Sequence, residues 1–430
     1  MSRPSVGTQE ATVAAGAINK LRFSKKRNTS KFFNTAAVGR EPQEAADEVE
    51  SNKSIDWEAA VRAVQVQFAR LLEAEQEEIS VFHNTTAAVQ RILLCLRRAL
   101  GGHPATLLTT DAEYPGIITA AVEHWHGPLA IARIGGHLWR GDAARAEKLL
   151  CEAFLLARPS VVYLSHVTRA TGYRLNADVI TFMRAVNPRT VLVVDGAQAT
   201  GNVFVGRDFL ADVDFYVTSG HKWLSGRTAL GLVCCAPHWH VADQAQGYSS
   251  RAGSAGTGSK EVLVSVSVAL QDFNGGTTGQ GEAGDARTRM MGVEARNTGL
   301  ALRFAKRVHG EHGLWCVGVD SPGWRTSGLI TVRDQGGILA TWDWRRQGFE
   351  FTSISPEQYA EPGMIVGAGP QYVVEEIQKT GTVRIRGFDI DEVRTAVPPG
   401  GGIRVSMHYY HRDKDVDELA DAFRNAARRR

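Results

Sequence analysis

The sequence predicts an α/β protein, with a mainly parallel sheet flanked by helices and a smaller C-terminal α+β domain. Two observations support this fold class. Between about residues 79 and 231, short apolar stretches alternate with helical stretches, which is typical of parallel strands joined by helical crossovers. From about residue 310 the pattern changes to short strands between turns, and the chain closes with a helix from Val416. The length of 430 residues is enough for about two to three domains.

The chain is expected to divide into three parts. Residues 1–31 are small, polar and basic and are interpreted as a mobile, solvated tail rather than a nucleic-acid arm. Residues 32–308 form the predicted large domain, in which the N-terminal segment 32–75 packs partly on the small domain. Residues 309–430 form the predicted small domain.

The composition excludes several classes of protein. A hydrophobic content of 43% and a charged content of 22% are ordinary for a soluble globular protein, and a net charge of +3 gives no global case for nucleic-acid or acidic-membrane binding. The five cysteines form no C-x-x-C pair, which fits free thiols in a reducing compartment and no zinc or other metal site. No apolar run has membrane-spanning length, and the N-terminus lacks the apolar core of a signal peptide. We therefore expect a cytoplasmic protein.

The expected elements follow from apolar periodicity. Apolar residues at three- and four-residue steps predict a helix from Ile55 to about Glu75. An apolar strand, Ile79–Phe82, then precedes a helix that ends near Leu100. The other predicted strands are 106–110, 129–134, 160–166, 191–194, 215–218, 329–333, 338–342, 383–386 and 403–407, and the other predicted helices lie near 115–125, 143–156, 177–186 and 286–309.

Two polar motifs follow neighbouring strands, D-G-A-Q at 195–198 and S-G-H-K at 219–222. Open α/β sheets bind ligands at the carboxyl ends of their strands, so Asp195 and Lys222 are expected to face one cleft. A lysine and a carboxylate placed in this way suit pyridoxal 5'-phosphate (PLP). The lysine amine holds the aldehyde, and the carboxylate holds the ring nitrogen so that the protonated ring can withdraw electrons. Gln198 could then hydrogen-bond the phenolic oxygen of the ring, and Ser219 and His221 could reach the phosphate.

With the hydrophobic strands before them, these motifs resemble the class V aminotransferase family of PLP-dependent, fold type I enzymes. The resemblance extends over about residues 32 to 425 and is densest over 83–231. The Tyr-Pro-Gly at 114–116 looks closest to the isopenicillin N epimerase-like branch, and the cysteine desulfurase-like enzymes are also similar. The resemblance implies that PLP is the cofactor.

A threonine pair, Thr85 and Thr86, opens the helix after the first strand. Hydroxyls and free backbone N–H groups at a helix N-terminus make a phosphate site, and the resemblance assigns this pair to the PLP phosphate. Ordinary helix capping is the alternative. The resemblance also implies that Tyr114 stacks on the pyridine ring, although a surface-turn tyrosine is the alternative.

The resemblance assigns substrate contacts as well. Arg404, in the G-I-R-V-S strand, is expected to bind the substrate α-carboxylate in a bidentate manner, unless it is a solvated edge-strand arginine. Asn34, in the segment that resembles a substrate-proximal piece of class V enzymes, is expected to line the pocket. Gly276-Thr277 matches a loop that touches the phosphate of the other subunit, which implies a homodimer with shared active sites.

The turn S-H-V-T-R-A-T-G at 165–172 departs from the family pattern. Many relatives carry a short polar residue where Arg169 stands. An arginine there places a fixed positive charge near the ring oxygen or binds a substrate carboxylate, and either would change the reaction preference. A second motif, G-x-G-x-x-G at 279–284, precedes a long helix and lacks the compact unit of a dinucleotide site, so we reject that interpretation.

The sequence thus predicts a PLP enzyme that acts at the Cα or Cβ of an amino acid, without metal, nucleic acid or membrane. Transamination, epimerisation and C–S or β-elimination remain open. A cysteine desulfurase is disfavoured because residues 380–403 contain no cysteine. A cofactor-free enzyme that forms a Schiff base on Lys222 would not need Asp195, Gln198 or the threonine pair. A PLP-binding regulator would need a DNA-binding module larger than the N-terminal tail.

Overall fold

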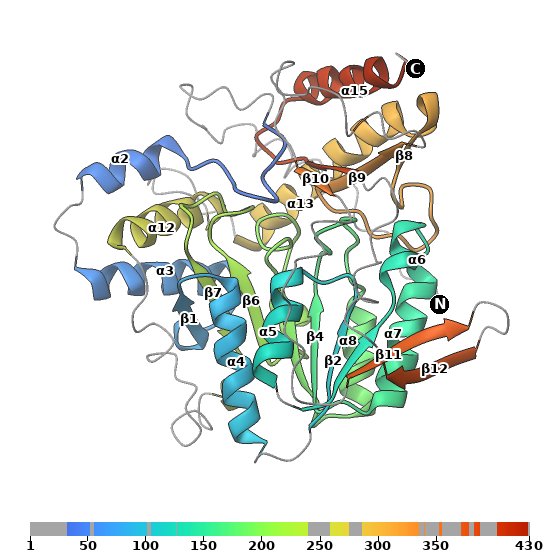
Figure 1. Ribbon diagram of the computed structural model, residues 1–430. Helices are drawn as coiled ribbons and strands as arrows, with labels where there is room; N and C mark the ends of the chain where they lie inside the picture. Colours follow the sequence, from blue (N-terminus) through green and yellow to red (C-terminus); the bar gives the residue numbers. More distant parts are fainter. Residues whose placement is uncertain are drawn as a thin grey trace, which may run out of the picture.

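The centre of the molecule is a nine-stranded, mostly parallel sheet, which confirms the predicted fold class (Figure 1). The computed structural model describes residues 32–51, 56–100, 105–125, 127–239, 259–274, 286–334, 339, 352–354, 371–377, 382–387 and 402–428. The predicted tail and Thr277 lie outside the described residues. The strand order is β1-β7-β6-β5-β4-β2-β3-β11-β12. The bounds are β1 Ile79–Phe82, β2 Leu107–Thr110, β3 Leu129–Ala132, β4 Val161–Ser165, β5 Val191–Asp195, β6 Phe215–Ser219, β7 Gly231–Cys235, β11 Gln371–Ile377 and β12 Thr382–Gly387.

The middle strands are buried on both faces because they are built from β-branched and other apolar residues. All five residues of β5 are buried, and β5 runs parallel to both β4 and β6. Two apolar clusters lie on opposite faces of the sheet. One face is covered by α4 (Thr85–Ala99) and α5 (Pro115–Trp125), and the other by α7 (Ala143–Ala157) and α8 (Ala177–Val186), as Figure 1 shows. This arrangement directs the carboxyl ends of β4, β5 and β6 to one edge.

A helical group flanks the sheet beside β1. It consists of α2 (Gln43–Ser51), α3 (Trp57–Leu72) and α12 (Lys260–Asn274), with α12 packed against the other two. The side chain of Asp56 caps α3 by accepting a hydrogen bond from the Ala59 amide, and Glu73 ends the helix in a left-handed conformation. The shorter helices α6 (Gly135–Trp139) and α9 (Arg207–Leu210) connect strands and were not predicted.

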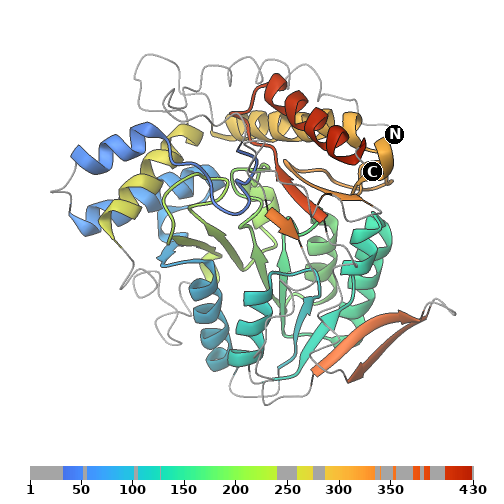
Figure 2. The ribbon, with the colours of Figure 1, turned by 45° about the horizontal axis from the view of Figure 1, so that its top comes forward.

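The C-terminal region builds a second, four-stranded antiparallel sheet in the order β10-β13-β9-β8. Its strands are β8 (Leu314–Cys316), β9 (Leu329–Asp334), β10 (Thr352–Ile354) and β13 (Gly402–Ser406). The helices α13 (Ala286–Val308) and α15 (Asp413–Arg428) lie side by side over this sheet (Figure 2). Ion pairs Arg303–Asp417 and Arg307–Asp421 join the two helices on their outer side.

The β11–β12 hairpin belongs to a different layer from the rest of the C-terminal region. β11 pairs in parallel with β3, at the edge of the large sheet, and β12 pairs with β11. The strand predicted at 383–386, within the small domain, is β12 and lies in the large sheet. Of the predicted strand at 338–342, only Leu339 is described, and it is helical.

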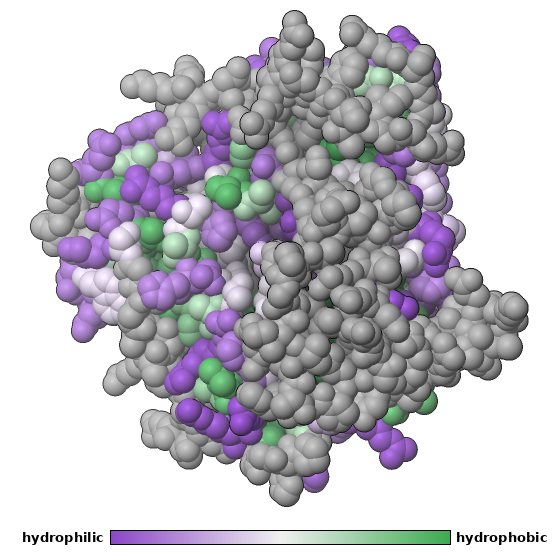
Figure 3. Space-filling view, in the orientation of Figure 1, coloured by the Kyte–Doolittle hydropathy of each residue, from purple (hydrophilic) through white to green (hydrophobic). Residues whose placement is uncertain are grey.

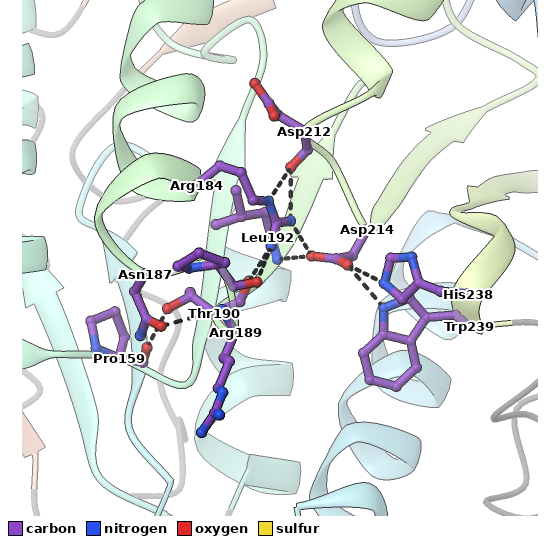
Figure 4. Close-up of polar contacts among 11 residues, drawn as sticks. Pro159, Arg184, Asn187, Arg189, Thr190, Leu192, Asp212, Asp214, His238 and Trp239 are labelled. Atoms are coloured by element: carbon purple, nitrogen blue, oxygen red, sulfur yellow. Dashed lines mark hydrogen bonds and ion pairs between the residues drawn. The ribbon is translucent and has the colours of Figure 1, made fainter.

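A polar cluster around the buried Asp214 joins the elements at the amino edge of the sheet (Figure 4). Asp214, just before β6, accepts hydrogen bonds from the Arg184 guanidinium of α8 at 2.6 Å and from the Leu192 amide of β5 at 2.7 Å. Its other oxygen contacts His238 Nε2 at 2.8 Å and Trp239 Nε1 at 3.0 Å. Because this carboxylate bonds to four groups from three parts of the chain, it fixes the base of the strands whose other ends carry the two motifs.

The surface seen in Figure 3 is mainly hydrophilic over α2, α3 and α4, with small separate apolar patches. Within the described ranges, no helix combines the length and the apolar character needed to cross a membrane.

Candidate active site

A cavity of about 300 Å³ lies at the carboxyl edge of the large sheet. Its walls come from three parts of the chain. Asp195 ends β5 and Lys222 follows β6, Ala36 and Ala37 come from the N-terminal segment, and Arg404 comes from β13. The volume lies at the lower end of the range for small-molecule sites. The predicted pair, Asp195 and Lys222, therefore opens onto one hollow.

Asp195 is held by two hydrogen bonds. Its Oδ1 accepts from the Ala197 amide at 2.7 Å, and its Oδ2 accepts from the Tyr163 hydroxyl at 2.6 Å. Burial and the nearby carboxylates raise the pKa of Tyr163 well above its usual value, so this hydroxyl stays protonated and remains a donor. Sequence reasoning missed Tyr163. The only local signal is a tyrosine in the middle of the mainly aliphatic strand β4.

Lys222 has a depressed pKa of about 8. Burial is the main cause, because it disfavours the ammonium form, and the nearby Arg404 and Arg169 lower the value further while Asp195 raises it. The turn is fixed by the N-terminal segment, since the Gly39 amide donates to the His221 carbonyl at 2.6 Å. A side chain at Gly39 would collide with the Lys222 carbonyl oxygen, so glycine permits this close approach.

The start of α4 forms one end of the cavity. Asn84 caps the helix by accepting from the Ala87 amide at 2.8 Å, so ordinary capping does not occupy the hydroxyls of Thr85 and Thr86. Both threonines line the cavity, and Thr85 also donates to the Thr218 carbonyl at 3.2 Å. Gly231, at the start of β7, allows this helix end to lie against the sheet, because a Cβ there would be 2.4 Å from the Asn84 carbonyl.

Two further polar groups near this end are buried without a hydrogen-bond partner, Ser219 Oγ and His221 Nδ1. His221 lines the cavity, whereas Ser219 is not among the lining residues. Burial and the positive charge of Lys222 lower the pKa of His221 to about 4, so the imidazole is neutral near pH 7. Buried polar groups normally have partners, so the unpaired His221 nitrogen beside the cavity is available to a polar ligand, whereas a contact of Ser219 with the phosphate stays a prediction.

Tyr114 and its neighbour Glu113 lie on different sides of the chain. Tyr114 lines the cavity and is 44% exposed. Glu113 is buried and accepts hydrogen bonds from the Thr110 hydroxyl at 2.9 Å and from the amide and hydroxyl of Ser165. Burial raises the pKa of Glu113 to about 7, and the charge of Asp195 adds to this effect. Glu113 was missed because nothing in the local sequence shows that it turns inward.

Gln198 lines the cavity, but protein partners use much of its amide. Its Nε2 donates to the Ala36 carbonyl at 2.9 Å, and its Oε1 accepts from Trp223 Nε1 at 2.9 Å. An amide nitrogen has two hydrogens, so one remains for a ligand. In the N-terminal segment, Ala36 and Ala37 line the cavity and Asn34 does not, so the contact of Asn34 with substrate stays a prediction.

Two arginines line the opposite wall. Arg404 is 1% exposed, and its Nη1 donates to the Arg169 carbonyl at 3.3 Å. The Arg169 guanidinium lies over the Tyr114 ring, 5.4 Å from the ring centroid. Among the described residues, no group of three or more His, Cys, Asp or Glu side chains is placed to bind a metal.

Comparison with known proteins agrees with this geometry. Residues 44–251 match the model of the family described as Aminotransferase class-V. The matched residues are just under half of the chain, and over them the chain is similar to the class V aminotransferase family. It is 28% identical over 380 residues to an isopenicillin N epimerase of Amycolatopsis lactamdurans, a match that spans 84% of this chain and 83% of that protein. It is 31% identical over 177 residues to an isopenicillin N epimerase of Streptomyces clavuligerus, over 39% of this chain and 41% of that relative, less than half its length.

The solved structures that are similar share the fold at low identity. The cysteine desulfurase CsdA of Escherichia coli superposes with a TM-score of 0.67 at 17% identity, over 96% of this chain and 98% of that chain. A cysteine desulfurase of Thermococcus onnurineus NA1 gives 0.66 at 15% identity, over 93% and 95%. A lysine-to-alanine mutant of C-DES, with glycine covalently linked to its PLP cofactor, gives 0.63 at 16% identity, over 92% and 96%.

The match to the class V aminotransferase model indicates pyridoxal 5'-phosphate as the cofactor. The residues of the cavity fit this group. A lysine with a depressed pKa and a carboxylate open onto the same hollow, as the aldehyde and the ring nitrogen require. The hydroxyls of Thr85 and Thr86 at a helix N-terminus and the unpaired His221 nitrogen suit a phosphate.

Proposed function

We propose that this class V aminotransferase relative is a PLP-dependent enzyme that removes the proton from the Cα of an amino acid, with Lys222 as the base. The observation that supports this most directly is the shared cavity. One hollow contains an amine with a pKa of about 8, a fixed carboxylate and a buried arginine. A cofactor-free Schiff-base enzyme would have no use for the carboxylate that Tyr163 and the Ala197 amide hold in place.

Each polar group then has a role. PLP, when bound, supplies an aldehyde that condenses with an amine and a protonated ring that withdraws electrons from the bonds at Cα. Asp195 holds the ring nitrogen, Thr85 and Thr86 with Ser219 and His221 hold the phosphate, and Tyr114 lies against the ring. Arg404 binds the α-carboxylate. Lys222 accepts the Cα proton, because a base is most effective when its pKa lies near the working pH.

Epimerisation is the reaction we favour after proton removal. The relative that is matched over 83% of its length bears the name isopenicillin N epimerase. Transamination and β-elimination, including C–S lysis, start from the same proton removal and are the alternatives. A desulfurase is less well supported, because Cys316 is buried in β8 and no cysteine is among the described residues that line the cavity.

We also propose a cytoplasmic homodimer with a small-molecule substrate. All five cysteines are free thiols, which supports a reducing compartment. The dimer is typical of the family, and the predicted contact through Thr277 lies outside the described residues.

Cofactor binding and proton exchange test the proposal separately. The purified protein should show the absorbance of lysine-bound PLP, which borohydride shifts and Lys222→Ala abolishes, whereas Lys414→Ala, an exposed lysine on α15, should leave it unchanged. In deuterated water, NMR of candidate amino acids should show loss of the Cα proton only with intact Lys222. Inverted product indicates epimerisation, a keto acid transamination, and a released thiol or pyruvate elimination. PLP binding with no exchange for any amino acid would indicate a regulator and contradict the proposal.

A further inference from the structure

Arg169 lies at the cavity in a hydrogen-bonded turn after β4. Hydroxyls of Thr168 and Thr171 hydrogen-bond to each other at 2.7 Å inside this turn. Thr331 of β9 donates to the Ala170 carbonyl at 2.6 Å, and Arg404 donates to the Arg169 carbonyl. The backbone of Arg169 is therefore bonded to the strand that carries Arg404.

The side chain of Arg169 is directed into the same hollow as the reactive amine. It lines the cavity together with Tyr114, and its guanidinium lies over that ring in a cation–π arrangement. Its charge also lowers the pKa of Lys222, which requires the two groups to be electrostatically close. Arg169 is partly buried, so its charge acts there with less screening than on an open surface.

Two of the groups that line the cavity are guanidiniums, whereas an amino acid with a neutral side chain brings only one carboxylate. Among the described lining residues, Arg169, Lys222 and Arg404 are cationic and Asp195 is anionic. One substrate carboxylate suffices for Arg404, and the phosphate end of the cavity is formed by hydroxyls and the α4 N-terminus. Arg169 brings a second planar guanidinium, whose geometry matches a carboxylate.

We infer that the substrate is an acidic amino acid with a second carboxylate on its side chain, and that Arg169 binds this distal carboxylate while Arg404 binds the α-carboxylate. This inference rests on the proposed function for the identity of the Arg404 ligand. Arg169 thereby determines specificity and takes no part in proton transfer. A charge that instead served only the phenolic oxygen of the cofactor would leave substrate preference unchanged.

Binding of acids that lack an amine tests this inference without turnover. Isothermal titration of the PLP-loaded protein with succinate, glutarate and adipate is compared with butyrate, valerate and hexanoate of the same chain lengths. We expect at least one dicarboxylate to bind about tenfold or more tightly than its monocarboxylate, because a second charge-assisted pair forms in the cavity. Arg169→Gln should reduce that ratio to about one while monocarboxylate binding persists, and Arg169→Lys should restore part of it, since lysine keeps the charge without the fork.

Arg333→Gln is the matched control. Arg333 also stacks on an aromatic ring, that of Trp139 at 5.7 Å, but it is not among the residues that line the cavity. This variant should retain the wild-type ratio of dicarboxylate to monocarboxylate affinity. Equal binding of dicarboxylates and monocarboxylates, or a preference that survives Arg169→Gln in a folded protein, would overturn the inference. The titration is repeated on PLP-free protein so that the proposed function and the role of Arg169 can fail separately. If the protein forms no lysine-bound PLP, the proposed function is wrong. The ratio of dicarboxylate to monocarboxylate affinity still decides whether Arg169 binds a second carboxylate.

Discussion

The pH dependence of Lys222 offers a direct test of the site. With a pKa of about 8, roughly one Lys222 amine in ten is neutral at pH 7, whereas an ordinary pKa of 10.5 would leave roughly one in three thousand. Only the neutral amine attacks an aldehyde or an acylating reagent. The structure therefore predicts that Lys222 is reactive near neutral pH because burial and two arginines disfavour its ammonium form.

Competitive acylation of the PLP-free protein, read by mass spectrometry, measures this ionisation. The labelling rate of Lys222 should rise about tenfold per pH unit up to about pH 8 and then level, a total of roughly ninetyfold between about pH 6 and pH 9. An unshifted lysine would gain roughly a thousandfold over the same interval and continue to rise. Lys414, exposed on α15, provides the internal reference for the reagent.

Two variants check the signs of the neighbouring charges. Asp195→Asn removes an anion that favours the ammonium form, so the pH midpoint of Lys222 labelling should move below that of the wild type. Arg404→Gln removes a cation that disfavours it, so the midpoint should move up. A labelling rate that climbs to about pH 10 without a plateau, or variants that shift the midpoint in the opposite directions, would refute the reasoning.

Four other substitutions, one of them a control, test the supporting structure. The pKa of Glu113 is raised from 4.5 to about 7, so between these pH values the native state retains a proton that the unfolded chain loses. The contribution of this protonated carboxyl group to stability is therefore complete below pH 4.5 and is lost as the pH rises through about 7. Glu113→Gln should remove this pH-dependent loss of stability, which amounts to up to about 3 kcal/mol. The free energy of urea unfolding should then vary less with pH than in the wild type, and an unchanged pH profile would contradict the raised pKa of Glu113. Tyr163→Phe deletes a hydrogen bond to a carboxylate and should lower the unfolding free energy by roughly 1–3 kcal/mol, whereas a neutral result would mean that Asp195 finds another donor. Gly231→Ala should lower the free energy of unfolding by roughly 1–3 kcal/mol and weaken PLP binding, because the added methyl group displaces the start of α4. Gly299→Ala, in open space on α13, is the control and should raise the free energy of unfolding by roughly 0.5–1 kcal/mol. Equal effects of the two substitutions would argue against the close contact at Gly231.

The sequence was most informative where chemistry follows a strand along the chain. Asp195 and Lys222 could be paired because Asp195 ends one apolar strand and Lys222 closely follows the next, and parallel strands bring such ends to one edge. Tyr163 and Glu113 could not be found in this way. Their contacts with Asp195 and Ser165 cross between strands, and a local pattern does not give the register of neighbouring strands.

Other differences have the same origin. The residues of β12 show a strand pattern, but nothing local indicates which sheet a strand joins, so its place beside β11 in the large sheet was not foreseen. Gln198 was expected to contact a ligand from its motif position alone. The structure shows that its amide also bridges Ala36 and Trp223, residues distant in sequence.

The composite origin of the cavity has a consequence for biosynthesis. Ala36, Asp195 and Arg404 reach one hollow from an early segment, the middle and a late strand of the chain. The Ser406 hydroxyl accepts from the Ala36 amide, and the Ser406 amide donates to the Phe33 carbonyl, so early and late segments close on each other. A nascent polypeptide that still lacks β13 lacks Arg404, and with it the proposed contact for the substrate carboxylate. The residues proposed to hold the cofactor all come earlier in the chain, so cofactor binding requires less of the polypeptide than substrate binding does.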